Sequence, residues 1–173
     1  MIKQAEKIRN MTIKAIWAQT PHGIIGDGSS MLWHLPEDLK HFADLTKNHT
    51  VVMGRKTWDS LPAKSRPLPQ RRNVVISRRA TALPGADEIS DDLSAVLQNE
   101  NNEELWVIGG GEICYQALPY LDEIHITRVL LDIDEGVYAP ELVGFVQQTG
   151  TSIRVSTTGI KYSFEVWVRE NAQ

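Results

Sequence analysis

The sequence Leu105-Trp106-Val107-Ile108-Gly109-Gly110-Gly111-Glu112 carries four apolar residues directly into a glycine turn. A short apolar run bounded by turn residues is typical of a strand that is buried on both faces. The residues after the glycines predict a helix through about Leu118, which Pro119 ends. This stretch therefore predicts a strand, a tight turn and a helix.

The same order occurs elsewhere along the chain. Thr50–Met53 is predicted as a strand, and Gly54-Arg55-Lys56-Thr57-Trp58 turns from it into a short helix. The remaining predicted elements are strands at Thr12–Ala18, Asn73–Ser77 and Glu123–Val129, a helix at Asp91–Gln98, and a C-terminal hairpin built from Ile153–Thr157 and the alternating residues Tyr162, Phe164, Val166 and Val168. This alternation predicts a single-domain α/β fold, with a mixed, mostly parallel eight-stranded sheet, about four flanking helices and a closing antiparallel hairpin.

Length and composition are those of one soluble domain. The chain has 173 residues, a hydrophobic content of 42% and no apolar run long enough to cross a membrane. We assign residues 11–173 to the domain and residues 1–10, which are polar, to an N-terminal extension, a scar or a misassigned start. The single cysteine, Cys114, excludes an intramolecular disulfide and favours a cytoplasmic protein. The five histidines have no metal-binding spacing, so no metal site is predicted.

A carboxylate on the apolar face of a helix is the main candidate for chemistry. From Pro36 onward, Leu35, Leu39, Phe42 and Leu45 recur at helical spacing, and Glu37, Lys40, His41 and Asp44 are expected to face away. Asp38 projects with the apolar side chains, between Trp33 and Phe42. Because a buried carboxylate is costly unless paired, Asp38 needs a structural partner or a cationic, hydrogen-bonding ligand. An ordinary helix-start role also remains open, since acidic residues are favoured there.

Two turns and a basic span suggest a phosphate-bearing ligand. Gly54–Thr57 and Gly109–Glu112 both follow strands and open helices, although tight packing would also explain the glycines. Eight basic residues and one acid lie between Arg55 and Arg79, a net +7 in a chain of net charge −4. A basic patch on an acidic protein favours a small polyanion over nucleic acid, although a solvated loop is the alternative. Gln19–Leu32 is predicted as a long loop, of the kind that often forms a lid.

Four blocks in this order resemble the dihydrofolate reductase family, most closely its actinobacterial type. They are W-x-L-P-x-D-L-x-x-F, V-V-M-G-R-K-T-W, R-P-L-P-x-R-x-N-V-V-I-S and V-I-G-G-G-E, and the match runs from about Met11 to the C-terminal hairpin. The resemblance implies an NADPH-dependent enzyme that reduces dihydrofolate to tetrahydrofolate, supports one-carbon metabolism, binds antifolate inhibitors and acts as a monomer.

The resemblance also implies roles for individual residues. The expected catalytic residues are Asp38, Trp33 and Thr127, with Asp38 binding the pterin ring and Thr127 bonding the carboxylate. Arg71 would pair the carboxylate of the glutamate tail. The substrate site would comprise Ile16, Trp17, Asp38, Phe42, Leu61, Arg71, Ile108 and Thr127. The cofactor site would comprise Ala18, Ile25, Gly54, Arg55, Lys56, Thr57, Ser77, Arg78, Gly109, Gly110, Gly111, Glu112 and Ile113, with Arg55, Ser77 and Arg78 at the 2′-phosphate.

Departures and alternatives qualify this interpretation. Val137 stands where related proteins often have an aspartate that latches the lid, so we expect closure to rest on packing of Ile25 and Leu32 and on the bound nicotinamide, and not on residues 134–138. One alternative is a reductase of the same fold from riboflavin synthesis, which would lack Arg71 and the block containing Asp38. Another is a non-catalytic folate- or nucleotide-binding module, which the intact carboxylate and the lid argue against.

Overall fold

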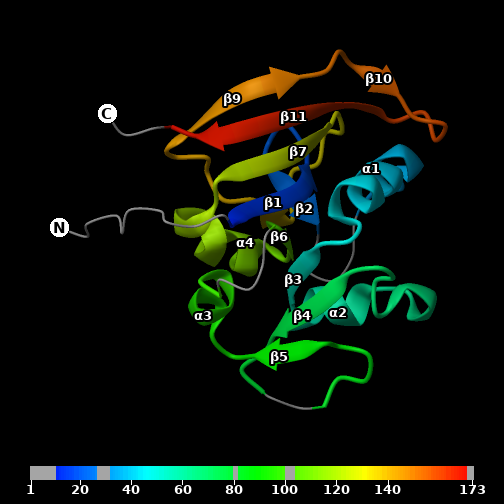
Figure 1. Ribbon diagram of the computed structural model, residues 1–173. Helices are drawn as coiled ribbons and strands as arrows, with labels where there is room; N and C mark the ends of the chain where they lie inside the picture. The colour runs from blue at the N-terminus through cyan, green and yellow to red at the C-terminus, as the bar shows by residue number, and fades with distance from the viewer. Residues whose placement is uncertain (1–10, 27–31, 80–81, 100–103, 171–173) are drawn as a thin grey trace.

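The computed structural model describes residues 11–26, 32–79, 82–99 and 104–170 (Figure 1). In chain order its elements are β1 Thr12–Gln19, β2 Ile24–Gly26, α1 Pro36–Thr46, β3 Thr50–Gly54, α2 Arg55–Ser60, η1 Ala63–Ser65, β4 Arg72–Ile76, β5 Glu88–Ser90, α3 Leu93–Leu97, β6 Glu104–Gly109, α4 Gly111–Ala117, η2 Leu118–Tyr120, β7 Glu123–Val129, β8 Val137–Tyr138, β9 Phe145–Gly150, β10 Arg154–Val155 and β11 Lys161–Arg169.

Within the described residues, nine of these strands form one sheet. Eight follow the order β10-β11-β7-β1-β6-β3-β4-β5, and β9 pairs with β11 beside this path. The pairs from β7 through β5 are parallel, whereas β11 runs antiparallel to β7, β9 and β10. The mostly parallel mixed sheet of an α/β fold is thereby confirmed, and so is the C-terminal hairpin. β2 and β8 form a separate two-stranded sheet.

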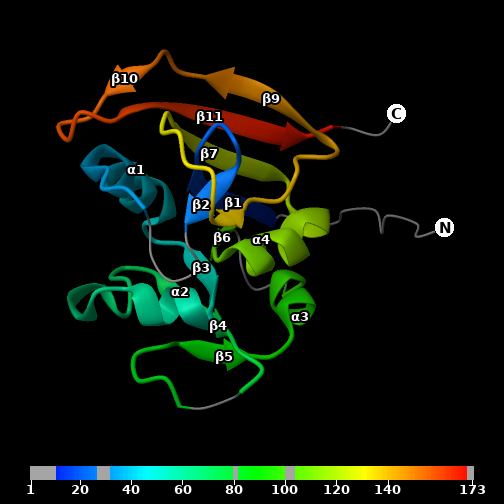
Figure 2. The ribbon, with the colours of Figure 1, turned by 180° about the vertical axis from the view of Figure 1, so that it is seen from behind.

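Helices cover the sheet on both faces, and alternate residues of each central strand serve the two faces. Val51 and Met53 of β3 pack in a cluster with Trp58 of α2, against which Phe42 of α1 also packs. Val52, between them, packs instead with residues of α3 and α4. Figures 1 and 2 show α1 and α4 on opposite sides of the sheet. Burial on both faces explains why the central strands read as continuous apolar runs.

Four strands lie where the sequence pattern predicts none: β2, β5, β8 and β9. Each is short or largely exposed, so none has the apolar alternation that identifies a strand. β2 lies inside the predicted loop Gln19–Leu32. The first strand of the hairpin shortens to Arg154–Val155. The prediction for α3 is confirmed with narrower bounds: the Asp92 carboxylate accepts from the Ala95 N–H and caps a helix that begins at Leu93 and ends at Leu97.

The apolar face of α1 differs from the prediction in one residue. Leu35 is buried and Phe42 and Leu45 are half-buried, but Leu39 is 53% exposed. Asp38 takes its place, with 9% exposure. Successive helical residues are rotated by about 100°, so a face that contains Asp38 at the centre of this stripe excludes its immediate neighbour. The predicted burial of Asp38 is therefore confirmed, and the predicted burial of Leu39 is wrong because Leu39 is the next residue along the helix and points away from the core.

Candidate active site

The carboxylate of Asp38 lies between α1 and β7. The hydroxyl of Thr127, which is 1% exposed, donates a hydrogen bond of 2.5 Å to Asp38 Oδ1. Burial raises the pKa of Asp38, and the hydrogen bond from Thr127 opposes that rise. No other hydrogen bond to this carboxylate is recorded among residues 11–26, 32–79, 82–99 and 104–170. A buried carboxylate with this much unused acceptor capacity is suited to a ligand that donates several hydrogen bonds.

The strand order places apolar residues beside this carboxylate. Thr127 pairs with Ala18 in the parallel ladder of β7 and β1, and β1 pairs on its other edge with β6. Ile16 of β1 and Ile108 of β6 belong to the same cluster as Phe42 and Leu61. These predicted substrate residues thus come together on the face that α1 covers.

The side chain of Trp17 belongs to the opposite face. It packs in the cluster with α3 and α4, and its indole Nε1 donates to Gln19 Oε1 at 2.8 Å. Trp17 is therefore not brought to the face that carries Asp38, unlike Ile16. Successive strand residues point to opposite faces, so two neighbours in β1 do not line one slot with their side chains.

Arg71 is held over the ring of Phe42. Its guanidinium carbon lies 5.7 Å from the ring centroid, Nη1 donates to Thr46 Oγ1 at 3.1 Å, and Nε donates to the Pro69 carbonyl at 2.9 Å. Burial lowers the pKa of Arg71, but an arginine remains charged at neutral pH. The result is an oriented cation at the apolar wall, which is the arrangement that binds a carboxylate well.

Trp33 is buried directly before α1. It is 8% exposed and packs in a cluster with Ala18, Leu35 and Tyr162. Its Nε1 atom is buried and has no hydrogen-bond partner in the described part of the chain. A buried donor of this kind is able to donate to a ligand or to a water.

The two predicted phosphate turns lie side by side, since β3 and β6 are neighbours. A Cβ atom at Gly109 or Gly110 would lie 3.5 Å from the Thr57 hydroxyl, and one at Gly54 would lie 3.8 Å from the Gly110 nitrogen. Gly109 has φ +129°, and the Gly109–Gly110 peptide is cis. The backbone of both glycine turns and the Thr57 hydroxyl thus come together at the carboxyl edge of the sheet, where open α/β sheets bind their ligands.

Gly111 has a different reason to be glycine. A Cβ there would approach Val137 Cγ1 to 2.8 Å and Ile25 Cδ1 to 3.2 Å. The packing explanation therefore holds for Gly111, whereas protein atoms leave ordinary van der Waals space at Gly110. The packing role that the sequence left open is thus supported for Gly111, and phosphate binding by this turn stays a prediction.

The predicted 2′-phosphate residues lie at the ends of neighbouring elements. Ser77 follows β4 and is 8% exposed, and its hydroxyl donates to the Arg79 carbonyl at 3.2 Å. Arg78 lies 3.7 Å from the Glu112 carboxylate and is mostly exposed, while Arg55 pairs with Asp59 at 3.0 Å. Arg78 thus contacts the second predicted phosphate turn, Gly109–Glu112, through an ion pair with Glu112.

Part of the predicted lid is tied to residues 137–139. Ile24 and Gly26 pair with Tyr138 and Val137, and the Ala139 N–H donates to the Gly23 carbonyl at 2.8 Å. Backbone bonds from residues 137–139 therefore hold the described start of this loop without an aspartate side chain, and the expectation about lid closure stays a prediction. The tip of the loop, residues 27–31, and any latch from Asp134 or Glu135 to it lie outside the described residues.

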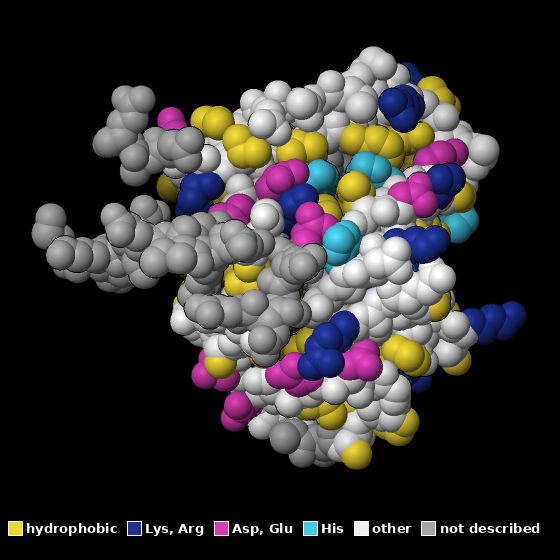
Figure 3. Space-filling view, viewed as in Figure 1, with side chains coloured by type: hydrophobic (Ala, Val, Ile, Leu, Met, Phe, Trp, Pro, Cys, Tyr) yellow, Lys and Arg dark blue, Asp and Glu magenta, His cyan; other side chains and the backbone are white. Residues whose placement is uncertain are grey.

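Charged and histidine side chains gather over the middle of the face that carries α1 (Figure 3). Lys14 pairs with Glu104 at 2.6 Å, and the His125 ring lies 2.6 Å from Glu123. Burial, followed by the charge of His125, lowers the pKa of His41, and burial also lowers the pKa of His125. Lys14, Glu104, Glu123 and His125 pair with one another, so these four side chains have structural partners.

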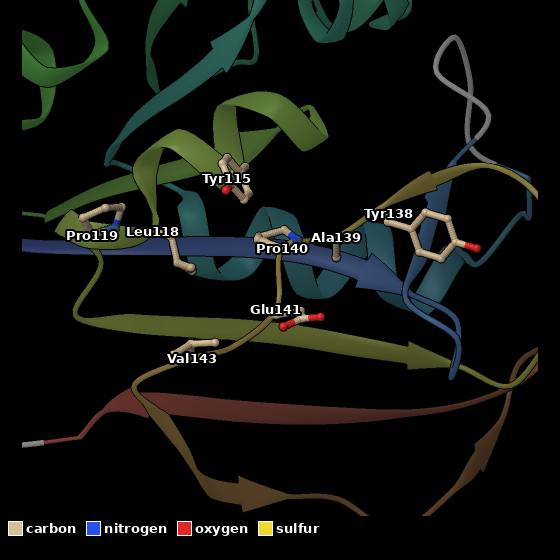
Figure 4. A pocket seen from close by; sticks show the side chains of 8 residues that line it. All are labelled: Tyr115, Leu118, Pro119, Tyr138, Ala139, Pro140, Glu141 and Val143. Atoms are coloured by element: carbon tan, nitrogen blue, oxygen red, sulfur yellow. The ribbon is translucent and has the colours of Figure 1, made fainter.

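A separate cavity of about 660 Å³ lies outside the predicted site. It is lined by Tyr115, Leu118, Pro119, Tyr138, Ala139, Pro140, Glu141 and Val143 (Figure 4). None of these residues was assigned to the substrate or the cofactor. Among the described residues, no basic side chain lines this cavity, as a phosphate site would need, and its one carboxylate, Glu141, is exposed, unlike the buried Asp38.

Sequence reasoning assigned Glu37 and His41 to the outer face of α1, and both in fact contact the C-terminal hairpin. The Glu37 carboxylate accepts from Ser156 Oγ and from the Thr157 N–H, and the His41 ring stacks on Phe164 with centroids 3.9 Å apart. Their partners lie more than a hundred residues away, so helical spacing alone gave no signal for these contacts.

Comparison with known proteins gives a consistent result. The chain matches the family model described as dihydrofolate reductase over residues 12–169, which spans β1 to β11. It is 43% identical over 150 residues to the dihydrofolate reductase of Mycobacterium tuberculosis strain H37Rv, covering 85% of this chain and 91% of that protein. It is 43% identical over 159 residues to the dihydrofolate reductase of Mycobacterium leprae, covering 89% and 96%, and 40% identical over 143 residues to that of Neisseria gonorrhoeae, covering 81% and 87%.

Proposed function

Because the chain belongs to the dihydrofolate reductase family, we propose that it carries out the family's reaction in the site around Asp38. The chain is an oxidoreductase that reduces 7,8-dihydrofolate to 5,6,7,8-tetrahydrofolate and so supports one-carbon metabolism. This function is favoured over a riboflavin-pathway reductase and over a non-catalytic module. The observation that carries the site assignment is the buried carboxylate of Asp38 beside Thr127.

We propose that Asp38 binds and orients the pterin ring. The ring's amino group and nitrogen donate hydrogen bonds, which the carboxylate can accept at positions that Thr127 leaves unused. An anion fixed at this place also favours a protonated, electron-poor imine, since it stabilises the positive charge that develops during reduction. Phe42 and Leu61 wall the p-aminobenzoyl group, and Arg71 pairs the carboxylate of the glutamate tail through its oriented guanidinium.

Nicotinamide cofactors are general in this family, and we propose NADPH for this chain. The fit is supported by the paired turns at Gly54–Thr57 and Gly109–Glu112 and by the exposed Arg78. When bound, the reduced nicotinamide supplies the hydride. The turns hold the phosphates, Ala18 and Ile25 line the ring, and Arg55, Ser77 and Arg78 hold the 2′-phosphate. Ile113 and Lys56 complete the proposed contacts.

We further propose that the protein controls water at the reacting ring. Trp33 and the segment from Gln19 to Leu32 exclude bulk solvent, while a single water delivers the proton to the ring nitrogen. The chain acts as a monomer with one domain over residues 11–173, in the cytoplasm, and antifolates compete with the substrate at Asp38. In the described part of the chain, no helix is long and apolar enough to cross a membrane.

The test is an assay of NADPH consumption with dihydrofolate, with and without a diaminopyrimidine inhibitor. We expect turnover with NADPH, weak turnover with NADH and competition between the inhibitor and dihydrofolate. Turnover of a ribosylated pyrimidine in place of dihydrofolate would instead support the riboflavin-pathway alternative. Tight binding of both ligands with no NADPH consumption would support the non-catalytic module.

A further inference from the structure

The carboxylate of Glu37 bridges the start of α1 and the turn between β10 and β11. Ser156 Oγ donates to Glu37 Oε2 at 2.6 Å, and the Thr157 N–H donates to Oε1 at 2.8 Å. The Thr158 hydroxyl donates to the His34 carbonyl at 2.9 Å, so the residues just before the helix are held as well. Both oxygens of one carboxylate are therefore used by a turn that lies 119 and 120 residues away in sequence.

The turn that receives Glu37 is itself well ordered by internal bonds. The Ser156 N–H donates to the Ile160 carbonyl at 2.8 Å, and the Gly159 N–H donates to the Ser156 carbonyl at 2.9 Å. Ser156 is 5% exposed. Such a turn is a fixed point to which a helix can be attached.

The same hairpin continues into the strand next to Thr127. Phe164 of β11 stands opposite Thr127 in the antiparallel ladder with β7. The His41 ring, one helical turn after Asp38, stacks on Phe164. α1 is thus attached to the hairpin on either side of Asp38, at Glu37 and at His41, and the hairpin is attached to the strand that carries the partner of Asp38.

Pro36 opens α1, but the helix has no side-chain cap at its start. Leu35 is its N-cap residue and makes no side-chain capping hydrogen bond. An ordinary acidic residue in a first turn interacts with the free N–H groups of its own helix. The Glu37 carboxylate accepts from Ser156 and Thr157 of the hairpin in addition to its own backbone N–H, and these bonds, the one from Ser156 first, lower the pKa of Glu37. The first turn of α1 is therefore held by a contact outside the helix as well as by its own backbone bonds.

We propose that Glu37 is a positioning residue, which ties the first turn of α1 to the Ser156–Thr158 turn and thereby holds Asp38 against Thr127. The inference rests on the role proposed above for Asp38. Without Glu37, the first turn is free to shift, and the Thr127 hydroxyl bonds the Asp38 carboxylate less well. Since that bond is what opposes the effect of burial, loosening it raises the pKa of Asp38.

The experiment compares Glu37→Ala, Glu37→Gln and Asp44→Ala with the full-length wild-type chain. Asp44 is the matched control, because it is an acidic residue of the same helix that pairs within the helix, with Lys40. The probe is a diaminopyrimidine inhibitor, whose ring needs an ionised Asp38, titrated from acidic to neutral pH. The KM for dihydrofolate, kcat and the NADPH affinity are measured beside it, well below the unfolding temperature of each variant.

We expect Glu37→Ala to raise the KM for dihydrofolate by roughly tenfold, as a small misplacement of a binding group does, and to leave NADPH affinity unchanged. Inhibitor affinity should fall on acidification as Asp38 becomes protonated, and in Glu37→Ala this fall (the acid limb of the affinity profile) should occur at a higher pH than in wild type. Glu37→Gln keeps an oxygen acceptor and should recover part of both effects, while Asp44→Ala should match wild type. The Glu37 variants leave the other titratable groups around α1 unchanged. These groups are His41 and Asp44 on the helix itself, His125 on β7 and Arg154 on β10.

A second variant pair distinguishes positioning from loss of stability. Ser156→Ala should weaken dihydrofolate binding in the wild-type background and add little in the Glu37→Ala background, because both remove the same contact. Additive effects, or an unchanged acid limb in Glu37→Ala, would overturn the proposal. Asp38→Asn is measured in the same assays: if it binds and turns over like wild type, the role of Asp38 and this inference both fail. If Asp38→Asn is impaired and Glu37→Ala is not, this inference alone fails.

Discussion

Thr127 and Asp38 lie 89 residues apart in sequence, yet the threonine hydroxyl donates directly to the carboxylate. The bond joins β7 to α1, the strand and helix between which the substrate ring is proposed to bind. It leaves most of the acceptor capacity of the carboxylate unused, in a place where burial penalises the ionised form. The unliganded site is therefore less stable electrostatically than the site with a cationic or hydrogen-bonding ring in place.

Replacing this carboxylate should stabilise the unliganded protein. Burial raises the pKa of Asp38 in the folded protein above its value in the unfolded chain, which is about 4. Above the folded-state pKa, the ionised carboxylate therefore lowers the stability of the fold. This loss of stability disappears as the pH falls from the folded-state pKa to the unfolded-state pKa. Asp38→Asn keeps an oxygen for the Thr127 hydroxyl and should raise Tm at pH 7. Thermal melts across the pH range should show the difference shrinking on acidification. A lower Tm for Asp38→Asn at pH 7 would contradict this account.

Arg71 should affect substrate binding without affecting the cofactor. Arg71→Lys keeps the charge but cannot reproduce the two-pronged contact that the bonds to Thr46 and Pro69 prepare. We expect the KM for dihydrofolate to rise in Arg71→Ala by a factor that corresponds to about 1.5–3 kcal/mol, and less in Arg71→Lys. Titration with NADPH should give wild-type affinity for both variants. A folate analogue without the glutamate tail should bind all three proteins equally, and a tail-independent loss would refute the assignment.

Arg78 should set the preference for NADPH over NADH. Arg78→Ala removes an exposed cation at the edge of the second phosphate turn, and should weaken NADPH by about 1.5–3 kcal/mol while leaving NADH nearly unchanged. Arg72→Ala is the matched control, because Arg72 begins β4, the strand that Ser77 and Arg78 follow, and pairs with Glu88 of β5 at 2.8 Å. Isothermal titration with both cofactors checks the expectation. Equal losses for NADPH and NADH would exclude a role at the 2′-phosphate.

Gly111 should be needed for packing. In Gly111→Ala the new methyl would lie 2.8 Å from Val137 Cγ1, and overpacking of this kind destabilises by about 1–3 kcal/mol. The double variant Gly111→Ala with Val137→Ala removes the closest contact and should recover most of the loss. Urea unfolding of the two single variants and the double variant measures this. Gly111→Ala with wild-type stability, or no recovery in the double variant, would show that the glycine is not there for packing.

The sequence predicted the parts of this molecule that depend on short-range patterns. Buried strands such as Leu105–Ile108 are apolar throughout, and the burial of Asp38 follows from helical spacing alone. The strands β2 and β9 escaped prediction because they are short or exposed, so their pairing depends on neighbours and not on their own pattern.

Contacts between distant segments were the main omission in the site. The pairing of β2 with β8 holds the start of the predicted lid through backbone bonds, which no side-chain pattern reveals. The apolar side chain of Leu39 predicts burial, but helical rotation turns Leu39 away from the face that buries its neighbour Asp38. Helical spacing predicts that Glu37 faces solvent, because its partners, Ser156 and Thr157, lie near the other end of the chain and leave no local signal.

Turnover of Asp38→Asn at pH 7 tests the central claim most directly. With NADPH and dihydrofolate saturating, we expect a loss of roughly 10²–10³-fold, as found when one group that stabilises developing charge is removed, with NADPH affinity unchanged. Activity should partly recover at low pH, where the substrate arrives already protonated. Near-wild-type turnover of Asp38→Asn at pH 7 would contradict the assignment of Asp38 as the substrate-binding carboxylate.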